Sequence, residues 1–327
     1  LRIPTPVGGI PMHIDAAPSI VFAVLYGLLF PFIISRFFIP GRRSMLLINV
    51  ILCTVERVVV YSLRATQALN PGRRTSSGLL IYLQLSFAQG FVQIAQDTIP
   101  LLRCLIVNAS GGPHHLEPSR YRKQLDPAPE DLPSARKRVR IFTNIFNLVW
   151  LASTIPGVAG FTKYGKALHD QMVGDKLQEL RYVSTGVALG LMLFTAAWIS
   201  TVMVRMRSID KGACRWLLLM LACMVVVCIY RLVVMQYHIP ELLYTGAGSQ
   251  QSAGAKAAFY LLHCLPEWIG SALLVVPNTR QRFQTGPWGD WRNFDGQKGC
   301  AEARKEATEK KRQKREEREA KNNAARV

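Results

Sequence analysis

Residues 216–236 read WLLLMLACMVVVCIYRLVVMQ, and Arg231 is the only charged residue among them. A helix rises about 1.5 Å per residue, so about 20 apolar residues cross the roughly 30 Å hydrocarbon core of a bilayer. Inside that core the backbone must satisfy its own hydrogen bonds, which favours a helix. The stretch therefore predicts a membrane-spanning helix.

Six further stretches of the chain are apolar in the same way. The expected spans are Ala17–Ile39, Ser44–Leu63, Gly78–Val107, Ile141–Phe161, Tyr182–Val204, Trp216–Gln236 and Ala257–Pro277. Hydrophobic residues make up 50% of the chain in spite of a very polar tail. The weaker, alternating pattern of a membrane β-barrel is missing from the sequence. We therefore expect an all-α polytopic integral membrane protein with seven transmembrane helices.

The spans divide the chain into three parts. We expect an N-terminal segment outside the membrane (1–16), a seven-helix transmembrane domain (17–277) and a basic cytoplasmic tail, partly helical or disordered (278–327). With the N-terminus outside, the inside segments carry about three times as many Lys and Arg residues as the outside segments. The positive-inside rule thus predicts the N-terminus outside and the C-terminus in the cytosol.

The chain is strongly basic, with a formal net charge of +19. Such a charge can indicate nucleic-acid binding, but basic cytoplasmic segments also face the anionic headgroups of a membrane. In a seven-span protein the second explanation is simpler. The partners that we expect are membrane lipids, an amphiphilic ligand, and a cytosolic partner at the basic loops and tail, and we expect no nucleic acid.

Polar residues inside the spans are the candidates for function, because charges there are costly and normally face the bundle interior or a watery cavity. The third span carries a stripe at alternating steps of four and three residues: Tyr82, Ser86, Gln89, Gln93, Gln96, Pro100 and Arg103. The residues that we expect to bind a ligand are Glu56, Arg57, Gln89, Gln93, Arg231, His263 and Glu267.

Depth along the spans predicts which buried charges neutralise each other. Rise per residue places Glu267 and Arg231 within about 7 Å of each other in depth, on neighbouring spans. We therefore expect this acid and base to pair and to line a cavity, with Glu56 and Arg57 near the same level. Asp97 and Arg103 are expected to form a separate set toward the inner face.

Three interpretations of these residues remain open. They form a hydrogen-bonded network that holds helices together, or they line a polar cavity for a ligand, or they form a catalytic site. Only His263 lies well inside a span, so we expect no metal site, and the last span has no Lys for a retinal Schiff base. We expect no cofactor and no enzymatic activity.

Several segments resemble those of fungal membrane proteins. They are Ala17-Pro18-Ser19 leading into Val21-Phe22, the pattern Glu56, Tyr61 and Arg64 in the second span, and the basic tail. With the seven spans, they are similar to the RTA-like lipid-translocating exporter family. The segment Phe259-Tyr260 with Pro266-Glu267-Trp268 resembles uncharacterised fungal seven-helix proteins of a receptor-like type. The resemblance implies handling or sensing of a lipid or amphiphile.

The sequence leads to one favoured function and two alternatives. We expect a multi-pass membrane protein that binds a lipid or small amphiphile and translocates or exports it. The first alternative is a seven-helix receptor that signals through residues 111–140, residues 205–215 and the tail. The second alternative is a membrane-embedded lipid enzyme.

Overall fold

The fold is all-α and polytopic, as the sequence predicts. The computed structural model describes residues 2–39, 42, 44–110, 133–206, 209–286, 289–290 and 316. Within these residues, seven helical stretches are long and apolar enough to cross a membrane. Most of the expected inner loop at 111–140 and of the tail at 278–327 lies outside the described residues.

Several spans consist of two consecutive helices. The helices are α1 (Ala16–Gly27), α2 (Phe30–Phe38), α3 (Ile48–Leu69), α4 (Ser77–Gln96), α5 (Thr98–Ala109), α6 (Pro133–Val149), α7 (Leu151–Phe161), α8 (Tyr164–Ala167), α9 (Gln171–Arg205), α10 (Lys211–Val234), α11 (Ala253–Phe259), α12 (Leu265–Val275) and α13 (Thr279–Arg282). Short 3-10 turns cover His13–Asp15, Met45–Leu47 and Pro71–Arg73, and a π-helical turn, Tyr260–Cys264, joins α11 to α12.

Prolines explain where three of the spans are interrupted. A proline has no N–H, so the carbonyl four residues earlier loses its helical donor. Pro31 follows the end of α1 at Gly27, and Pro100 follows the end of α4 at Gln96. Pro266 comes four residues after Leu262, and Leu262 is the middle residue of the π-helical turn. The backbone breaks thus follow directly from the positions of these prolines.

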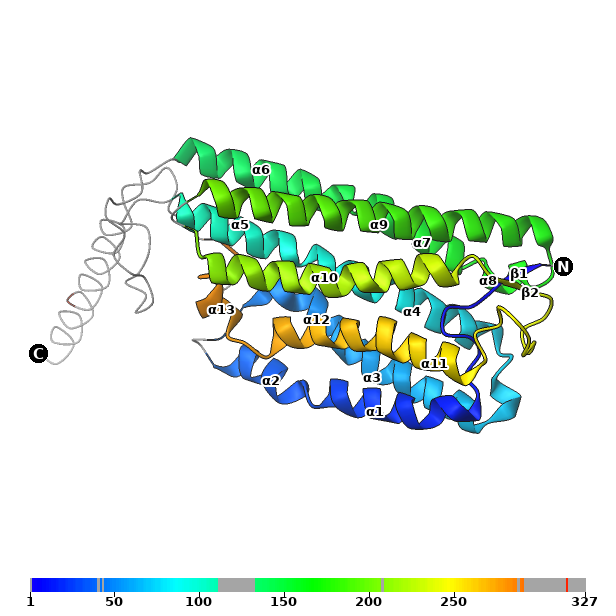
Figure 1. The fold of residues 1–327 in the computed structure, drawn as a ribbon. Helices are drawn as coiled ribbons and strands as arrows, with labels where there is room; N and C mark the ends of the chain where they lie inside the picture. The colour runs from blue at the N-terminus through cyan, green and yellow to red at the C-terminus, as the bar shows by residue number, and fades with distance from the viewer. Residues whose placement is uncertain are drawn as a thin grey trace, which may run out of the picture.

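The helices run side by side along the bundle (Figure 1), with β1 (Ile3–Pro4) and β2 (His238–Ile239) at one end and α13 at the other. We call the end that carries β1 and β2 the N-terminal end, and the end that carries α13 the opposite end. The two strands pair antiparallel, with Ile3 opposite Ile239. The charge bias of the sequence predicts that the opposite end faces the cytosol, and this orientation stays a prediction.

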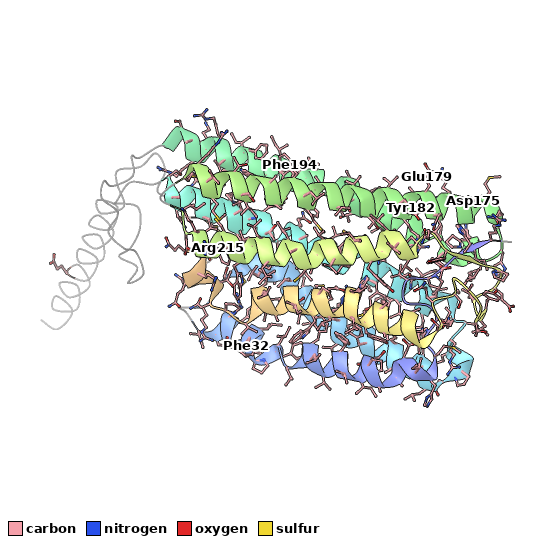
Figure 2. All side chains as sticks on the ribbon, viewed as in Figure 1. Phe32, Asp175, Glu179, Tyr182, Phe194 and Arg215 are labelled. Carbon is pink, nitrogen blue, oxygen red and sulfur yellow. The ribbon has the colours of Figure 1, made fainter. Side chains whose placement is uncertain are left out.

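The fifth span is longer than the sequence predicted. Its helix, α9, has 35 residues and begins at Gln171 rather than at Tyr182. Asp170 caps it by accepting hydrogen bonds from two backbone N–H groups in the first turn. Figure 2 shows Asp175 and Glu179 in this added part, near the N-terminal end. An apolar run marks only the part of a helix that crosses the hydrocarbon core, so it did not predict the polar first turns of α9.

Residues 3–11 close the N-terminal end of the bundle. Val7 and Ile10 are fully buried, and the side-chain amide of Gln84 in α4 exchanges two hydrogen bonds with the backbone of Val7, at 2.9 and 3.0 Å. The segment therefore packs on the transmembrane helices as part of the fold. From here on, the name N-terminal segment refers to residues 3–11.

The third span lies at the centre of the bundle. Of the seven spans it has the largest buried share, 61% of its apolar window against 22% for α9. Helix α4 packs against α3, α7, α10 and α12. Side chains that project from α4 can therefore reach most of the other helices, and the polar residues of this span sit where several helices meet.

Candidate functional site

Four polar side chains form a continuous series inside the bundle. They are Arg57 of α3, Glu267 of α12, His263 of the π-helical turn and Arg231 of α10, and each is at most 1% exposed. We call this series the interior charge chain. Because bulk solvent does not reach these side chains, each charge needs a counter-charge or hydrogen-bond partners inside the bundle.

Arg57 and Glu267 form the strongest link. Nε and Nη2 of Arg57 donate to the same carboxylate oxygen of Glu267, at 2.7 and 2.5 Å. Nη2 also donates to the carbonyl of Ser86 in α4, at 2.9 Å. The pair therefore connects three helices, and removing either partner would leave a buried charge without its counter-ion.

This link corrects the predicted pairing of Glu267 with Arg231. Nη1 of Arg231 lies 3.1 Å from the carbonyl of Phe87 and 3.3 Å from Nε2 of His263. His263 in turn places Nδ1 3.6 Å from the second oxygen of Glu267. Depth was a sound guide to the level of these residues. It could not give the rotation of each helix about its own axis, and that rotation decides which partner a side chain meets.

Aromatic rings enclose the chain. His263 makes ring contacts with Phe87, Phe91, Tyr230 and Phe259 at centroid distances of 5.4 to 6.4 Å. These apolar walls keep water away and strengthen each electrostatic contact inside them. The interior charge chain is thus enclosed by aromatic rings, and it connects α3, α10 and α12 around α4.

A glycine makes room for the central ion pair. A Cβ atom at Gly90 of α4 would lie 1.7 Å from Nη2 of Arg57 and 2.2 Å from Oε1 of Glu267. No side chain fits there. Gly90 was not among the residues predicted from the sequence, although a glycine inside a spanning helix that carries polar residues is a signal of close helix approach.

A second charged cluster lies nearer the N-terminal end, and the sequence did not predict it. Asp15 accepts from Arg64 at 2.9 Å, from Lys256 at 2.7 Å and from the hydroxyl of Tyr260 at 2.9 Å. Arg64 and Lys256 also donate to the carbonyl of Gly8, at 2.7 and 3.0 Å. This cluster ties the N-terminal segment to the bundle.

The remaining three predicted residues lie on the surface of the bundle. Gln93 is exposed, Gln89 is half-buried, and the side chain of Glu56 is 35% exposed. Helix α4 presents Gln89 and Gln93, and its neighbour α3 presents Glu56. We call the strip formed by Glu56, Tyr82, Ser86, Gln89, Gln93 and Gln96 the polar face.

Hydrogen bonds fix the polar face at several points. Ser86 donates to Glu56 at 2.5 Å, and the amide of Gln89 lies 3.5 Å from the carbonyl of Thr154 in α7. The carboxylate of Glu56 is also 3.5 Å from Nη1 of Arg57. Glu56 therefore joins the polar face to the interior charge chain, and the predicted residues divide between these two connected regions.

Asp97 and Arg103 have different partners, contrary to the expectation of one inner-end set. Asp97 accepts from Asn49 at 3.4 Å and from the backbone N–H of Val50 at 3.2 Å. Arg103 donates to Asn144 of α6 at 3.0 Å. Asp97 lies at the break between α4 and α5 and Arg103 lies within α5, and their partners belong to α3 and α6 respectively.

The described residues contain no group of three or more His, Cys, Asp or Glu side chains that could hold a metal ion. The groups present can donate and accept hydrogen bonds and can hold charge. No protein-family model, no curated protein and no solved structure matches this chain.

Proposed function

We propose that this multi-pass membrane protein binds the polar head of a lipid or small amphiphile along the polar face and moves it through the membrane. The observation that carries the proposal is the exposure of Gln93, with Gln89 and Glu56 beside it, within two membrane-spanning helices. Polar side chains that face hydrocarbon are unfavourable, and in spans they mark pathways for polar substrates.

The geometry of the polar face suits a head group that moves while its tails stay in the lipid. Tyr82, Gln89, Gln93 and Gln96 follow one another along about four turns of a single helix, so a head group would pass from one to the next. Their side chains supply both donors and acceptors without a full charge. Uncharged partners hold a head group weakly enough for it to leave each position.

The receptor alternative rests on a different observation. The interior charge chain connects α3, α4, α10 and α12 through a few contacts. A ligand that broke one contact would change how these helices pack. A sensor would then show ligand-dependent recruitment of a cytosolic partner without lipid movement.

Lipid movement in proteoliposomes tests the proposal. The purified full chain is reconstituted with a trace of fluorescent lipid, and the rate at which label in the inner leaflet becomes accessible to an outside quencher is measured. We expect faster exchange than in protein-free vesicles. Gln93→Leu should reduce the rate about fivefold, since it removes a contact worth about 1 kcal/mol.

A matched control separates the polar face from general surface polarity. Thr201 is an exposed polar residue of α9, so Thr201→Leu makes another part of the bundle surface apolar. We expect this variant to retain the full rate. Equal rates for the wild type, both variants and empty vesicles would reject the proposed translocation.

A further inference from the structure

Four arginines in the bundle are fully buried, and only two of them have a carboxylate partner. They are Arg57, Arg64, Arg181 and Arg231. Arg57 pairs with Glu267, and Arg64 pairs with Asp15. Within the described part of the chain, no carboxylate oxygen lies within 4.0 Å of Arg181 or Arg231.

The contacts of these two arginines are with neutral groups. Arg181 donates to the carbonyl of Thr5 at 2.9 Å and lies 3.3 Å from the side-chain oxygen of Gln178. Arg231 contacts the carbonyl of Phe87 and the ring of His263. In both arginines Nε is buried and has no hydrogen-bond partner. Each therefore keeps its full charge and an unused donor.

The two guanidinium groups lie near the same ring. Cζ of Arg181 is 5.7 Å from the centroid of Phe161, and Cζ of Arg231 is 5.8 Å from it. The two Cζ atoms are therefore no more than about 11.5 Å apart, the sum of these distances. Ring faces stabilise cations but do not neutralise them. The result is a local excess of positive charge inside the bundle.

Such an arrangement is unfavourable unless an anion completes it. Arginine stays protonated in proteins, so the charge cannot be removed by losing a proton. A water molecule can satisfy Nε but leaves the charge uncompensated in a low dielectric. A phosphate or carboxylate satisfies both requirements, since its oxygens accept from guanidinium donors in charge-assisted hydrogen bonds.

The site adjoins the polar face. A Cβ atom at Gly157 of α7 would lie 2.8 Å from the amide nitrogen of Gln89 and 2.7 Å from the hydroxyl of Ser184, so these three residues meet. Phe161 is one turn beyond Gly157 in α7, and Arg181 is one turn before Ser184 in α9. Arg181 and the Phe161 ring, which Arg231 also contacts, therefore lie about one helical turn beyond the level of Gln89.

We propose that Arg181 and Arg231 form a binding site for one anionic group of the phosphate or carboxylate class. The group is the head of an amphiphile or a free anion of the same chemistry. The carbonyl of Thr5 covers Arg181 from the N-terminal segment. Where the bound group is an amphiphile, the proposal adds that its head group is negatively charged, and in that respect it rests on the proposed function.

Binding to the purified full chain in detergent tests the site without any transport. The probes are dodecyl phosphate and inorganic phosphate, and the reading is the thermal unfolding midpoint as a function of probe concentration. We expect saturable stabilisation, with the apparent Kd at least about tenfold weaker in Arg181→Gln and in Arg231→Gln, since each loses charge-assisted hydrogen bonds. Saturation by both probes identifies a free-anion site, and saturation by dodecyl phosphate alone identifies an amphiphile site.

Two further variants keep the experiment decisive. Arg73 is an exposed arginine near the N-terminal end, so Arg73→Gln should bind as the wild type does. If a glutamine variant fails to fold, Arg181→Lys and Arg231→Lys retain the charge, lose the planar donor pair and should still weaken binding. Saturation by neither probe, or equal affinity in the wild type and all arginine variants, would overturn the inference. Anion binding by a protein that moves no lipid would leave this site standing and reject only the proposed translocation.

Discussion

The interior charge chain and the polar face lie side by side in the same bundle, but they satisfy their polar groups in opposite ways. The interior chain, from Arg57 through Glu267 and His263 to Arg231, is buried, and the contacts that it makes are with its own members and with backbone carbonyls. The polar face is made mostly of neutral amides and hydroxyls, and Gln93 is exposed.

The difference follows from the energy of placing each kind of group in a membrane. An ion without a partner is far more costly there than an amide, so ions are enclosed and amides can face outward. The Arg57–Glu267 pair is matched in charge and has little left to offer a ligand, whereas Arg231 at the end of the chain keeps a donor without a partner. The comparison therefore assigns the Arg57–Glu267 pair to the stability of the bundle and leaves the polar face and the adjoining Arg231 free for binding.

The largest effect is expected at Gly90. Gly90→Ala would place a methyl group on the Arg57–Glu267 pair, so the pair must separate or the helices must move apart. Overpacking and a disrupted buried pair together should lower the free energy of unfolding by about 3 kcal/mol or more. The thermal unfolding midpoint in detergent measures this loss.

Gly186 of α9 provides the control for this substitution. A Cβ atom there meets nothing within 4 Å. Gly186→Ala should keep or raise the unfolding midpoint, because alanine favours a helix over glycine by about 1 kcal/mol. Equal effects at the two glycines would show that the interior chain does not hold the bundle.

A large effect is also expected from the central ion pair. Arg57→Gln and Glu267→Gln should each lower the free energy of unfolding by about 3–5 kcal/mol, since each leaves a buried charge unpaired. The double variant should lose much less than the sum of the two. A double-mutant cycle between Glu267 and Arg231, which are connected only through His263 in the described contacts, should show a weaker coupling than the Arg57–Glu267 cycle. A stronger coupling with Arg231 than with Arg57 would restore the pairing expected from depth.

A smaller effect is expected where the N-terminal segment is attached. The hydroxyl of Tyr164, outside the spans, donates to the carbonyl of Pro4. Tyr164→Phe should lower the free energy of unfolding by about 1 kcal/mol. Tyr237→Phe, at a side chain that is 39% exposed, is the control and should have little effect.

The pH dependence of Tyr164 provides a second reading. Burial raises the pKa of Tyr164 above its ordinary value, so the folded state favours the protonated form. The stabilisation is present below the unfolded pKa of about 10 and is lost as the pH rises above it. Wild-type stability should therefore fall more steeply between about pH 9.5 and 11 than that of Tyr164→Phe. Parallel curves would place the alkaline sensitivity elsewhere.

The smallest effect on stability is expected at the polar face. Gln93 is exposed, so Gln93→Leu should change the free energy of unfolding by no more than about 0.5 kcal/mol while it slows lipid movement. Unfolding and exchange are measured on the same preparation. A large loss of stability would make Gln93 part of the structural network and would remove the contrast between the two regions.

The sequence by itself determined the seven helices and the residues that are polar inside them. An apolar run such as 216–236, with a single charged residue, indicates a membrane-spanning helix, and prolines mark three of the breaks. The sequence also singled out Glu56, Arg57 and Glu267, because a charged residue inside a span is unusual. These are local properties, and local sequence is enough to find them.

Only the tertiary structure decided which of these residues meet. The partner of Glu267, the outward position of Gln93 and the space left by Gly90 all depend on how each helix is rotated and packed. Arg181 is another such case, since it came from a part of α9 that apolarity did not mark. Rise per residue fixes height along one helix, whereas the angle about its axis is set by all of its neighbours together.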